Sequence, residues 1–513
     1  ITLCIIVLLI VLNPNKKYQK MVVNENKWTD IINKKKENNK LKIDSLVFND
    51  YNLLIDNDNN TIYYSVVDSL NKYNPLIKYY ANDKNADLVF NKQINDDIIK
   101  NNESVKVMIY NKDSYHIYDL ISTTLPILNI SYNNNDNNKR IPMDLYLFDN
   151  REKSIKRVIK SKGNISYNET DSEKKDYTFS LMQESIGHNE RENNLSILGM
   201  KEHSEYVLNS LHDSEKIRNV FTTNLWNLTN DTMHNDNYEY VELFVNNSYV
   251  GLYSLGYNIE KESLRLKNDE FLFYKSTFAN SENSYKTSSK LEGYLLYDNN
   301  LDRIKRREDI NINCEDETKE GCKRIDGWEE LNKFYSIIDS DNIEEIKNTT
   351  NINNAINIYL FYLLVQPTNN INEETFSNTY LLFKKEKDSY EVSYLPWKLD
   401  YTFGNDLNNE YSISYDNNNY IMIHSSINKL ITLNDEETID KIKKRYNQLR
   451  NSIWSEDNLH NLINNYENRI FLSGAYNRDI ANLNASENYN DLNTFKNYIS
   501  NRLKSMDEYI NNL

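Results

Sequence analysis

Short apolar segments separated by Asn- and Asp-rich turns dominate residues 41–121. β-branched and aromatic residues are concentrated in four of them: Leu46–Phe48, Thr61–Tyr64, Leu88–Phe90 and Val105–Tyr110. This pattern is typical of short strands joined by turns. We therefore predict a small all-β, sandwich-like module here. It holds no cluster of catalytic residue types, so binding or spacing is its expected role.

From residue 122 to the end, the pattern mixes strands with helices. Within Tyr240–Leu255, the alternating residues Val241, Leu243 and Val245 lead into Asn246-Asn247, two residues that tolerate positive φ, which predicts a hairpin. Residues 353–365 form an apolar helix candidate, and residues 276–330 are polar and charged, as in an insertion. We predict an α+β domain over residues 122–513.

The C-terminal third carries two apolar stripes at helical spacing. Residues recur at intervals of three and four in each stripe, which indicates two amphipathic helices with core-facing sides. Asp435-Glu436-Glu437 precedes the first stripe, as the helix dipole favours. The stripes are Ile439, Ile442, Tyr446, Leu449 and Ile453, and then Leu492, Phe495, Tyr498, Ile499, Leu503 and Met506.

The first twelve residues, ITLCIIVLLIVL, are almost wholly apolar, and Lys16 and Lys17 follow. A membrane-spanning helix needs about 20 such residues. We read residues 1–20 as a truncated signal peptide or signal anchor, with membrane anchoring through residues 1–12, and residues 21–40 as a linker. The chain is then expected to follow the secretory pathway to an extracellular or cell-surface location.

Length, charge and cysteines narrow the function classes. A chain of 513 residues exceeds one ordinary core of roughly 250–300 residues. The formal net charge of −16 repels phosphate backbones, so nucleic acid is excluded as a partner. Cys314 and Cys322 could form a disulfide after export, or remain two isolated thiols. Asn-x-Ser/Thr sequons such as Asn129 permit glycosylation.

Standard catalytic motifs are missing from the sequence. It contains no His-Glu-x-x-His, no Gly-x-Ser-x-Gly and no Gly-rich phosphate loop. One segment stands out, Tyr394–Gly404 (YLPWKLDYTFG), in which an extended apolar run leads to the carboxylate of Asp400 and then to Phe403-Gly404. Protein kinases place a Mg²⁺-binding Asp in such a context. The alternative is a strand-end Asp that caps a turn.

Several motifs in this order resemble the spore-coat-protein-H (CotH) kinase family. Pro396–Gly404 is similar to its Pro-Trp-Asp-x-Asp-x-x-Phe-Gly signature, and Asn247–Tyr253 is similar to its Asn-Gly-x-Tyr-x-Gly-x-Tyr hairpin. The resemblance covers about residues 125–513. The remaining matches are Lys162–Ser166, Lys174–Tyr177, Leu195–Asn219, the Glu373–Leu381 loop and the helical tail that ends near Leu503.

The resemblance implies an atypical protein-kinase-like fold that transfers phosphate from ATP to proteins with Mg²⁺ or Mn²⁺. Lys174 or Lys175 would hold the α/β-phosphates, and Asn378 and Asp400 the metal. Arg218 and Asn219 occupy cofactor-binding positions, where they would organise the site, as would Asp213. Asp213 could instead cap a helix, and the two lysines could be a solvated pair.

The chain departs from the family at three carboxylates. Lys398 replaces the first Asp of the signature, Tyr257 stands where the family has Glu, and the catalytic-loop Asp corresponds to Asn372 or Glu373. At about 4 Å and an effective dielectric near 20, each unit-charge term is on the order of 4 kcal/mol, so the reversal would weaken binding of a divalent cation unless the lysine points outward or contacts phosphate itself.

Two hypotheses remain from the sequence. The first is an active kinase that uses Glu373 as catalytic base, with Asn378 and Asp400, on Ser/Thr of secreted, coat or wall proteins. The second is a pseudokinase that acts as a surface scaffold, adhesin or wall component.

Overall fold

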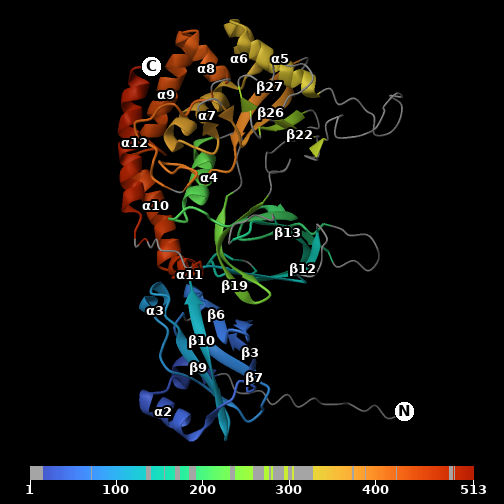
Figure 1. Ribbon diagram of the computed structural model, residues 1–513, viewed down its shortest axis with the longest axis vertical. Helices are drawn as coiled ribbons and strands as arrows, with labels where there is room; N and C mark the ends of the chain where they lie inside the picture. The colour runs from blue at the N-terminus through green and yellow to red at the C-terminus, as the bar shows by residue number, and fades with distance from the viewer. Residues whose placement is uncertain are drawn as a thin grey trace, which may run out of the picture. The chain divides into compact units, whose positions relative to one another are not determined.

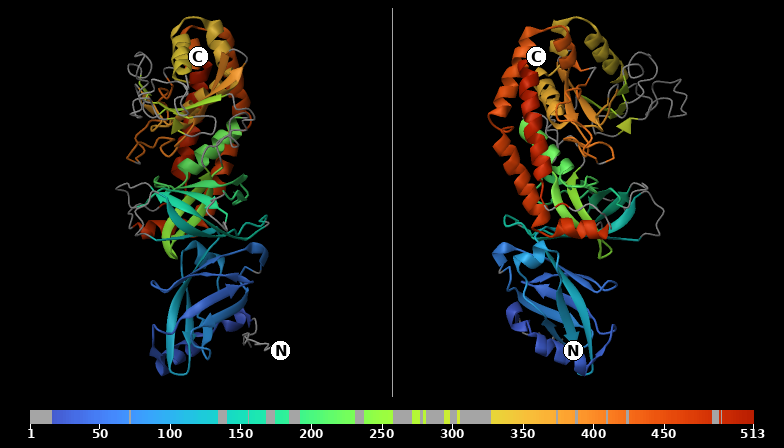
Figure 2. Two further views of the ribbon diagram at one scale, coloured as in Figure 1. Left: turned by 90° about the vertical axis from the view of Figure 1, so that its right-hand side faces the viewer. Right: turned by 60° about the vertical axis from the view of Figure 1, so that its left-hand side comes forward.

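The computed structural model describes residues 16–70, 72–133, 140–154, 156–167, 174–183, 192–230, 237–257, 271–276, 279–280, 294–297, 303–304, 327–372, 375–386, 389–408, 410–422, 425–483, 489 and 491–513. The chain forms two compact units (Figures 1 and 2). Unit 1 comprises Ile1–Ser210, Tyr240–Tyr253 and Asn468–Asn488, and unit 2 comprises Leu211–Glu239, Ser254–Glu467 and Tyr489–Leu513.

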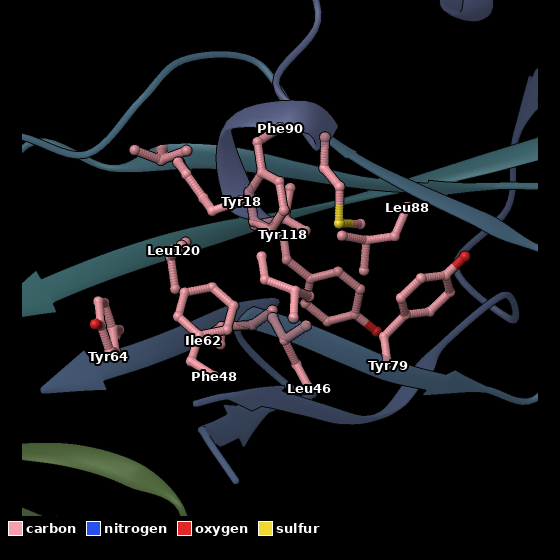
Figure 3. Packing of buried hydrophobic residues seen from close by; sticks show 14 of the residues in the cluster. Tyr18, Leu46, Phe48, Ile62, Tyr64, Tyr79, Leu88, Phe90, Tyr118 and Leu120 are labelled. Atoms are coloured by element: carbon pink, nitrogen blue, oxygen red, sulfur yellow. The ribbon is translucent and has the colours of Figure 1, made fainter. Parts of the chain in front are cut away.

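The N-terminal module of unit 1 contains two sheets around one core. The first has the order β1 (Lys16–Lys17), β7 (Leu76–Ala81), β3 (Ile43–Phe48) and β4 (Tyr51–Asn52). The second has the order β5 (Leu54–Asp56), β6 (Thr61–Ser65), β10 (Ser114–Thr123), β9 (Val105–Tyr110) and β8 (Asp87–Phe90), with β2 (Lys36–Glu37) on β10. Leu46, Phe48, Ile62 and Leu120 come from both sheets and meet in this core (Figure 3). The four strands predicted from the apolar segments are β3, β6, β8 and β9.

The residues before β3 differ from the expected linker. They form α1 (Tyr18–Met21) and α2 (Glu25–Lys34). Tyr18 is completely buried, with its ring centroid 4.5 Å from that of Phe90. Ile31 of α2 is buried in a cluster that includes Met108. The polar average of this segment hides a narrow apolar stripe, and one such stripe is enough to dock a surface helix.

A closed barrel completes most of unit 1. Its strand order is β11 (Ile127–Tyr132), β12 (Ile141–Phe148), β13 (Val158–Tyr167), β14 (Tyr177–Met182), β17 (Glu205–Asn209), β19 (Ser248–Tyr257) and β18 (Glu239–Val245). Asn246 and Asn247 have φ of 52° and 70°, which confirms the predicted hairpin turn. Other elements of this unit are α3 (Asp96–Lys100), β15 (Leu195–Ser196), β16 (Glu202–His203) and α11 (Ala475–Asn482).

Unit 2 contains a five-stranded sheet covered by helices. The sheet order is β23 (Arg303–Ile304), β22 (Tyr294–Tyr297), β20 (Phe271–Ser276), β26 (Thr379–Glu386) and β27 (Ser389–Pro396). A smaller sheet has the order β21 (Ala279–Asn280), β25 (Thr375–Phe376) and β24 (Ile371–Asn372). The helices are α4 (Arg218–Thr229), α5 (Gly327–Asp339), α6 (Ile343–Thr349), α7 (Ile352–Val365), α8 (Ser426–Thr432), α9 (Glu436–Arg450), α10 (Glu456–Phe471, which continues into unit 1) and α12 (Asn493–Asn511).

Helix α7 lies at the centre of unit 2. Its residues from Asn354 to Val365 are all buried, and it packs on β27, α9 and α12 (Figure 1). The predicted helices correspond to α7, α9 and α12, and the Asp435 side chain accepts a hydrogen bond from the Thr438 N–H at the start of α9. The chain is therefore an α+β protein.

Three sequence predictions lie largely or wholly outside the described residues. Most of the expected insertion at 276–330 does, and so do Cys314 and Cys322 and the apolar residues 1–12. Within the part of the chain that the structure describes, no helix combines the length and apolar character needed to cross a membrane.

Candidate functional site

Lys174 forms a buried ion pair inside unit 1. Its Nζ lies 2.9 Å from Oδ1 of Asp479 on α11 and donates a hydrogen bond to the Leu252 carbonyl at 2.8 Å. The ammonium also lies 4.6 Å from the centroid of the Tyr253 ring. The side chains of Lys174 and Asp479 are 5% and 0% exposed. The charge of Lys174 is therefore met on several sides within the barrel unit.

Gly251 makes room for this ion pair. It has a φ of 146°, a conformation that L side chains rarely adopt, and a Cβ there would lie 2.4 Å from Asp479 Oδ1. The next residue, Leu252, donates its N–H to the same Oδ1 at 2.8 Å. The glycine of the predicted hairpin is thus required so that β19 can approach the carboxylate.

Lys175 has a different environment from its neighbour. Its Nζ lies 4.1 Å from the centroid of the Tyr167 ring, and the side chain is partly exposed. Of the two lysines that the sequence singled out, Lys174 is the one in a buried ion pair. Its partner Asp479 lies 305 positions away and has no local sequence signal.

Asp400 is held by helix α4 of unit 2. Asn219 donates from Nδ2 to Asp400 Oδ1 at 2.6 Å. The amide oxygen of Asn219 is buried and has no hydrogen-bond partner among the described residues. An orphan oxygen next to a carboxylate is the kind of environment that a cation would satisfy.

Arg218 fixes the loop that carries Asp400. The guanidinium is completely buried, donates to the Thr402 carbonyl at 3.0 Å and forms an ion pair with Glu215 at 3.0 Å. Burial alone would lower the pKa of Arg218, but Glu215, Tyr411 and Asp213 together outweigh it, and the pKa lies above its ordinary value. Arg218 was predicted as a cofactor-binding residue, and the structure places its guanidinium on the Thr402 carbonyl and the Glu215 carboxylate.

Asp213 holds the start of α4. Its Oδ2 accepts hydrogen bonds from the backbone N–H groups of Ile217 at 2.8 Å and Arg218 at 3.2 Å. The helix-capping interpretation therefore describes Asp213. Because Arg218 and Asn219 begin α4, this carboxylate helps to place both of them.

Asn378 lies beside the segment that leads to Asp400. It precedes β26, and its carbonyl accepts from the N–H of Trp397, which follows β27, at 2.8 Å. Asn370 donates to the carbonyls of both Asn378 and Trp397, at 3.0 and 2.8 Å. The Asn378 side chain donates to the Asn369 carbonyl at 2.9 Å, which leaves its amide oxygen for a cation. The sequence did not single out Asn370.

Lys398 lies beside the tryptophan of its own motif. It is exposed, and its Nζ lies 5.0 Å from the Trp397 ring centroid. It makes no ion pair with Asp400. A second lysine, Lys275 of β20, places its Nζ 3.3 Å from the same centroid. Burial, and then the charge of Lys398, lowers the pKa of Lys275 to about 7.

Strained backbone marks this segment. Asn378, Lys398 and Phe403 have φ of 49°, 53° and 50°. Asn tolerates this conformation, whereas at Lys398 and Phe403 it costs on the order of 1–3 kcal/mol each, and such strain clusters at functional sites. Gly404 has a φ of 87°, and a Cβ there would lie 2.4 Å from the Tyr498 ring. The Phe-Gly of the signature is therefore a turn that this packing requires.

The oxygen donors fit a cation that is shared with phosphate. Mg²⁺ is commonly bound by one or two carboxylates together with substrate phosphates and water. Asp400 and Asn378 offer a carboxylate and an amide oxygen, and within the described ranges no group of three or more His, Cys, Asp and Glu could enclose a metal. Glu373, the predicted base, lies outside the described residues, and Asn372 is described only as part of β24.

The comparisons agree with these motifs. A family model described as CotH kinase protein matches residues 159–506. No curated protein matches the chain. Because the family match covers more than half of the 513 residues, the chain belongs to the CotH kinase family and is a kinase-like protein.

Proposed function

We propose that this chain is a metal-dependent protein phosphotransferase that uses ATP. Membership of the family points to ATP and a divalent cation. Phosphoryl transfer requires a lysine and a metal that meet the charge on the phosphoryl oxygens. Unit 1 offers a buried, ion-paired lysine, and unit 2 offers a positioned carboxylate.

The proposed roles follow from the side-chain environments. Lys174, held by Asp479 as kinase lysines are held by a carboxylate, binds the α/β-phosphates. Asp400 and Asn378 hold the cation, which neutralises charge on the phosphates when it is bound. Asn219 and Arg218 orient Asp400 and its loop. Glu373 remains the proposed base for the acceptor hydroxyl.

One observation carries the proposal. The lysine that replaces a family carboxylate forms no ion pair with Asp400, and its Nζ is placed over the Trp397 ring. The Asp400 carboxylate accepts a hydrogen bond from the neutral amide of Asn219 at 2.6 Å. Lys398 itself therefore does not occupy Asp400 through an ion pair, which supports Asp400 as a cation ligand.

The acceptor and the location also belong to the proposal. The apolar residues 1–12 followed by lysines support entry into the secretory pathway. Ser or Thr of a secreted, coat or wall protein is then the acceptor class. The alternative is a pseudokinase scaffold. Lys398 favours the pseudokinase alternative, because a positively charged side chain at this position disfavours a divalent cation nearby.

Labelled ATP tests the proposal directly. The purified chain is incubated with ATP and Mg²⁺ or Mn²⁺, and transfer to itself and to a generic acceptor is measured. Asp400→Asn is expected to abolish transfer, whereas Asp440→Asn, at an exposed position on α9, leaves it unchanged. Equal transfer by Asp400→Asn contradicts the proposed role. The pseudokinase alternative remains if the wild-type chain transfers no phosphate and its Tm does not change when nucleotide and metal are added together.

A further inference from the structure

Two lysines that have no carboxylate partner share one indole ring in unit 2. The Nζ atoms of Lys275 and Lys398 lie 3.3 and 5.0 Å from the Trp397 centroid. Neither forms an ion pair or donates a hydrogen bond to the described residues. Lys275 also lies 5.6 Å from the Tyr380 centroid. Most buried cations in proteins are paired, so a half-buried, unpaired ammonium next to a second one requires an explanation.

The aromatic ring stabilises this arrangement only in part. A cation–π contact contributes about 0.5–2 kcal/mol, depending on desolvation. Two like charges that are close together repel, and partial burial adds to that cost. The lowered pKa of Lys275 reports the same two effects. An anion bound by both ammonium groups would remove the repulsion and satisfy their donors.

The position of the pair limits the class of anion. Lys275 is opposite Tyr380 in the β20–β26 ladder. The backbone N–H of Trp397 donates a hydrogen bond to the Asn378 carbonyl. Asp400 follows Lys398 by two residues. The two lysines therefore belong to the same strand ends as the candidate cation ligands. An anion bound there would lie near the proposed divalent cation. Polyphosphates are anions that bind divalent cations as well as ammonium groups.

We propose that Lys275 and Lys398 form a polyphosphate-binding site that works without a divalent cation. Lys398 supplies a positive charge at the position where the family signature has an Asp, a side chain that can bind metals. The left-handed φ of 53° at Lys398 is a conformation that Asp and Asn adopt more readily than Lys. The backbone thus suits the family carboxylate, and the lysine is the specialised feature of this chain.

Metal-free binding tests the site. The full chain is titrated calorimetrically in EDTA with sodium tripolyphosphate and, separately, with ATP. We expect binding by the wild-type chain, a loss of roughly tenfold in affinity for Lys275→Met or Lys398→Met, and no binding by the double variant. Lys444→Met, an exposed lysine of α9, is the matched control and keeps the wild-type affinity. Circular dichroism and Tm establish that each variant is folded.

A charge-reverting variant sharpens the test. Lys398→Asp restores the family signature, so it is expected to lose metal-free binding and to gain at least tenfold in affinity for ATP when Mg²⁺ is added. No binding by the wild-type chain in EDTA overturns the site. So does binding that survives in both lysine variants but disappears in Lys174→Met. Tripolyphosphate binding without ATP binding identifies free polyphosphate as the ligand.

The outcome is separable from that of the proposed function. Metal-free binding without phosphate transfer contradicts only the phosphotransferase. Metal-dependent transfer without binding in EDTA contradicts only the two-lysine site.

Discussion

The lysine of unit 1 and the lysines of unit 2 differ in how their charge is met. Lys174 is buried against a carboxylate, a carbonyl and an aromatic ring. Lys275 and Lys398 have one indole ring in common and no carboxylate partner among the described residues. The comparison teaches that protein groups meet the charge of Lys174, whereas the charges of Lys275 and Lys398 are left for the anion that we propose.

The largest expected effect on stability comes from breaking the ion pair between Lys174 and Asp479. Lys174→Met leaves the Asp479 carboxylate buried, so the free energy of unfolding should fall by about 3–5 kcal/mol. Urea denaturation measures it. Lys175→Met is the control, with an expected loss of less than about 1 kcal/mol. Lys174→Met with Asp479→Leu should recover much of the loss, and failure to do so would indicate that other contacts of Asp479 dominate.

The pH dependence of stability tests the unpaired lysines. The pKa of Lys275 is about 7 in the folded chain, below its ordinary value, because of burial and the charge of Lys398. Between pH 7 and 10 the unfolded chain therefore binds a proton that the folded chain has released, and stability rises with pH by at most about 1.4 kcal/mol per unit. Urea denaturation over this range measures the rise.

Lys275→Met should remove that rise, and Lys444→Met should not. An identical pH profile for Lys275→Met and the wild-type chain would mean that Lys275 stays protonated. Saturating tripolyphosphate should also flatten the wild-type profile, because a bound anion favours the charged lysine.

A smaller effect on stability is expected at the Asp400 support. Asn219→Leu removes the 2.6 Å hydrogen bond, so unfolding free energy should fall by about 1–3 kcal/mol. Apparent Mg²⁺ affinity in the presence of ATP should fall about 10–100-fold, since residues that orient a metal ligand have such effects. Titration of Tm with Mg²⁺ measures the affinity. Asn227→Leu, on the partly exposed side of α4, is the control, and an unchanged Mg²⁺ titration in Asn219→Leu would remove the positioning role.

The smallest effect concerns backbone strain at Lys398. Lys398→Asn places a residue that tolerates φ of 53°, so stability should rise by up to about 1 kcal/mol. The same variant should bind tripolyphosphate less well in EDTA. A loss of stability instead would show that the contact of Lys398 with Trp397 outweighs the strain.

Local patterns were sufficient for much of the fold. The Asn246-Asn247 turn, helix α7 and the helices α9 and α12 follow from spacing and turn chemistry within one segment. Within the predicted linker the structure has α2, and Ile31 of this helix packs against residues of strands that are distant in sequence. Burial of a sparse stripe is a tertiary property, and average polarity does not report it.

The candidate site residues also fall into those that the sequence revealed and those that it did not. The motif around Asp400 was visible because its residues are consecutive, and Lys398 was visible as a charge reversal. The position of the Lys398 side chain beside the Trp397 ring could not be predicted, because that position depends on a left-handed φ at a strand end. Asp479 of unit 1 and Lys275 of unit 2 were missed because each meets its partner, Lys174 or Trp397, through packing between segments far apart in the chain.

The ion pair of Lys174 and Asp479 also has a consequence for biosynthesis. The two residues are 305 positions apart, so a ribosome that adds about 5–20 residues per second makes the carboxylate roughly 15–60 s after the lysine. Until then Lys174 lacks its Asp479 partner. The phosphate-binding lysine of the proposed enzyme can therefore reach its final state only when nearly the whole chain has been synthesised, and a nascent or prematurely terminated chain would lack it.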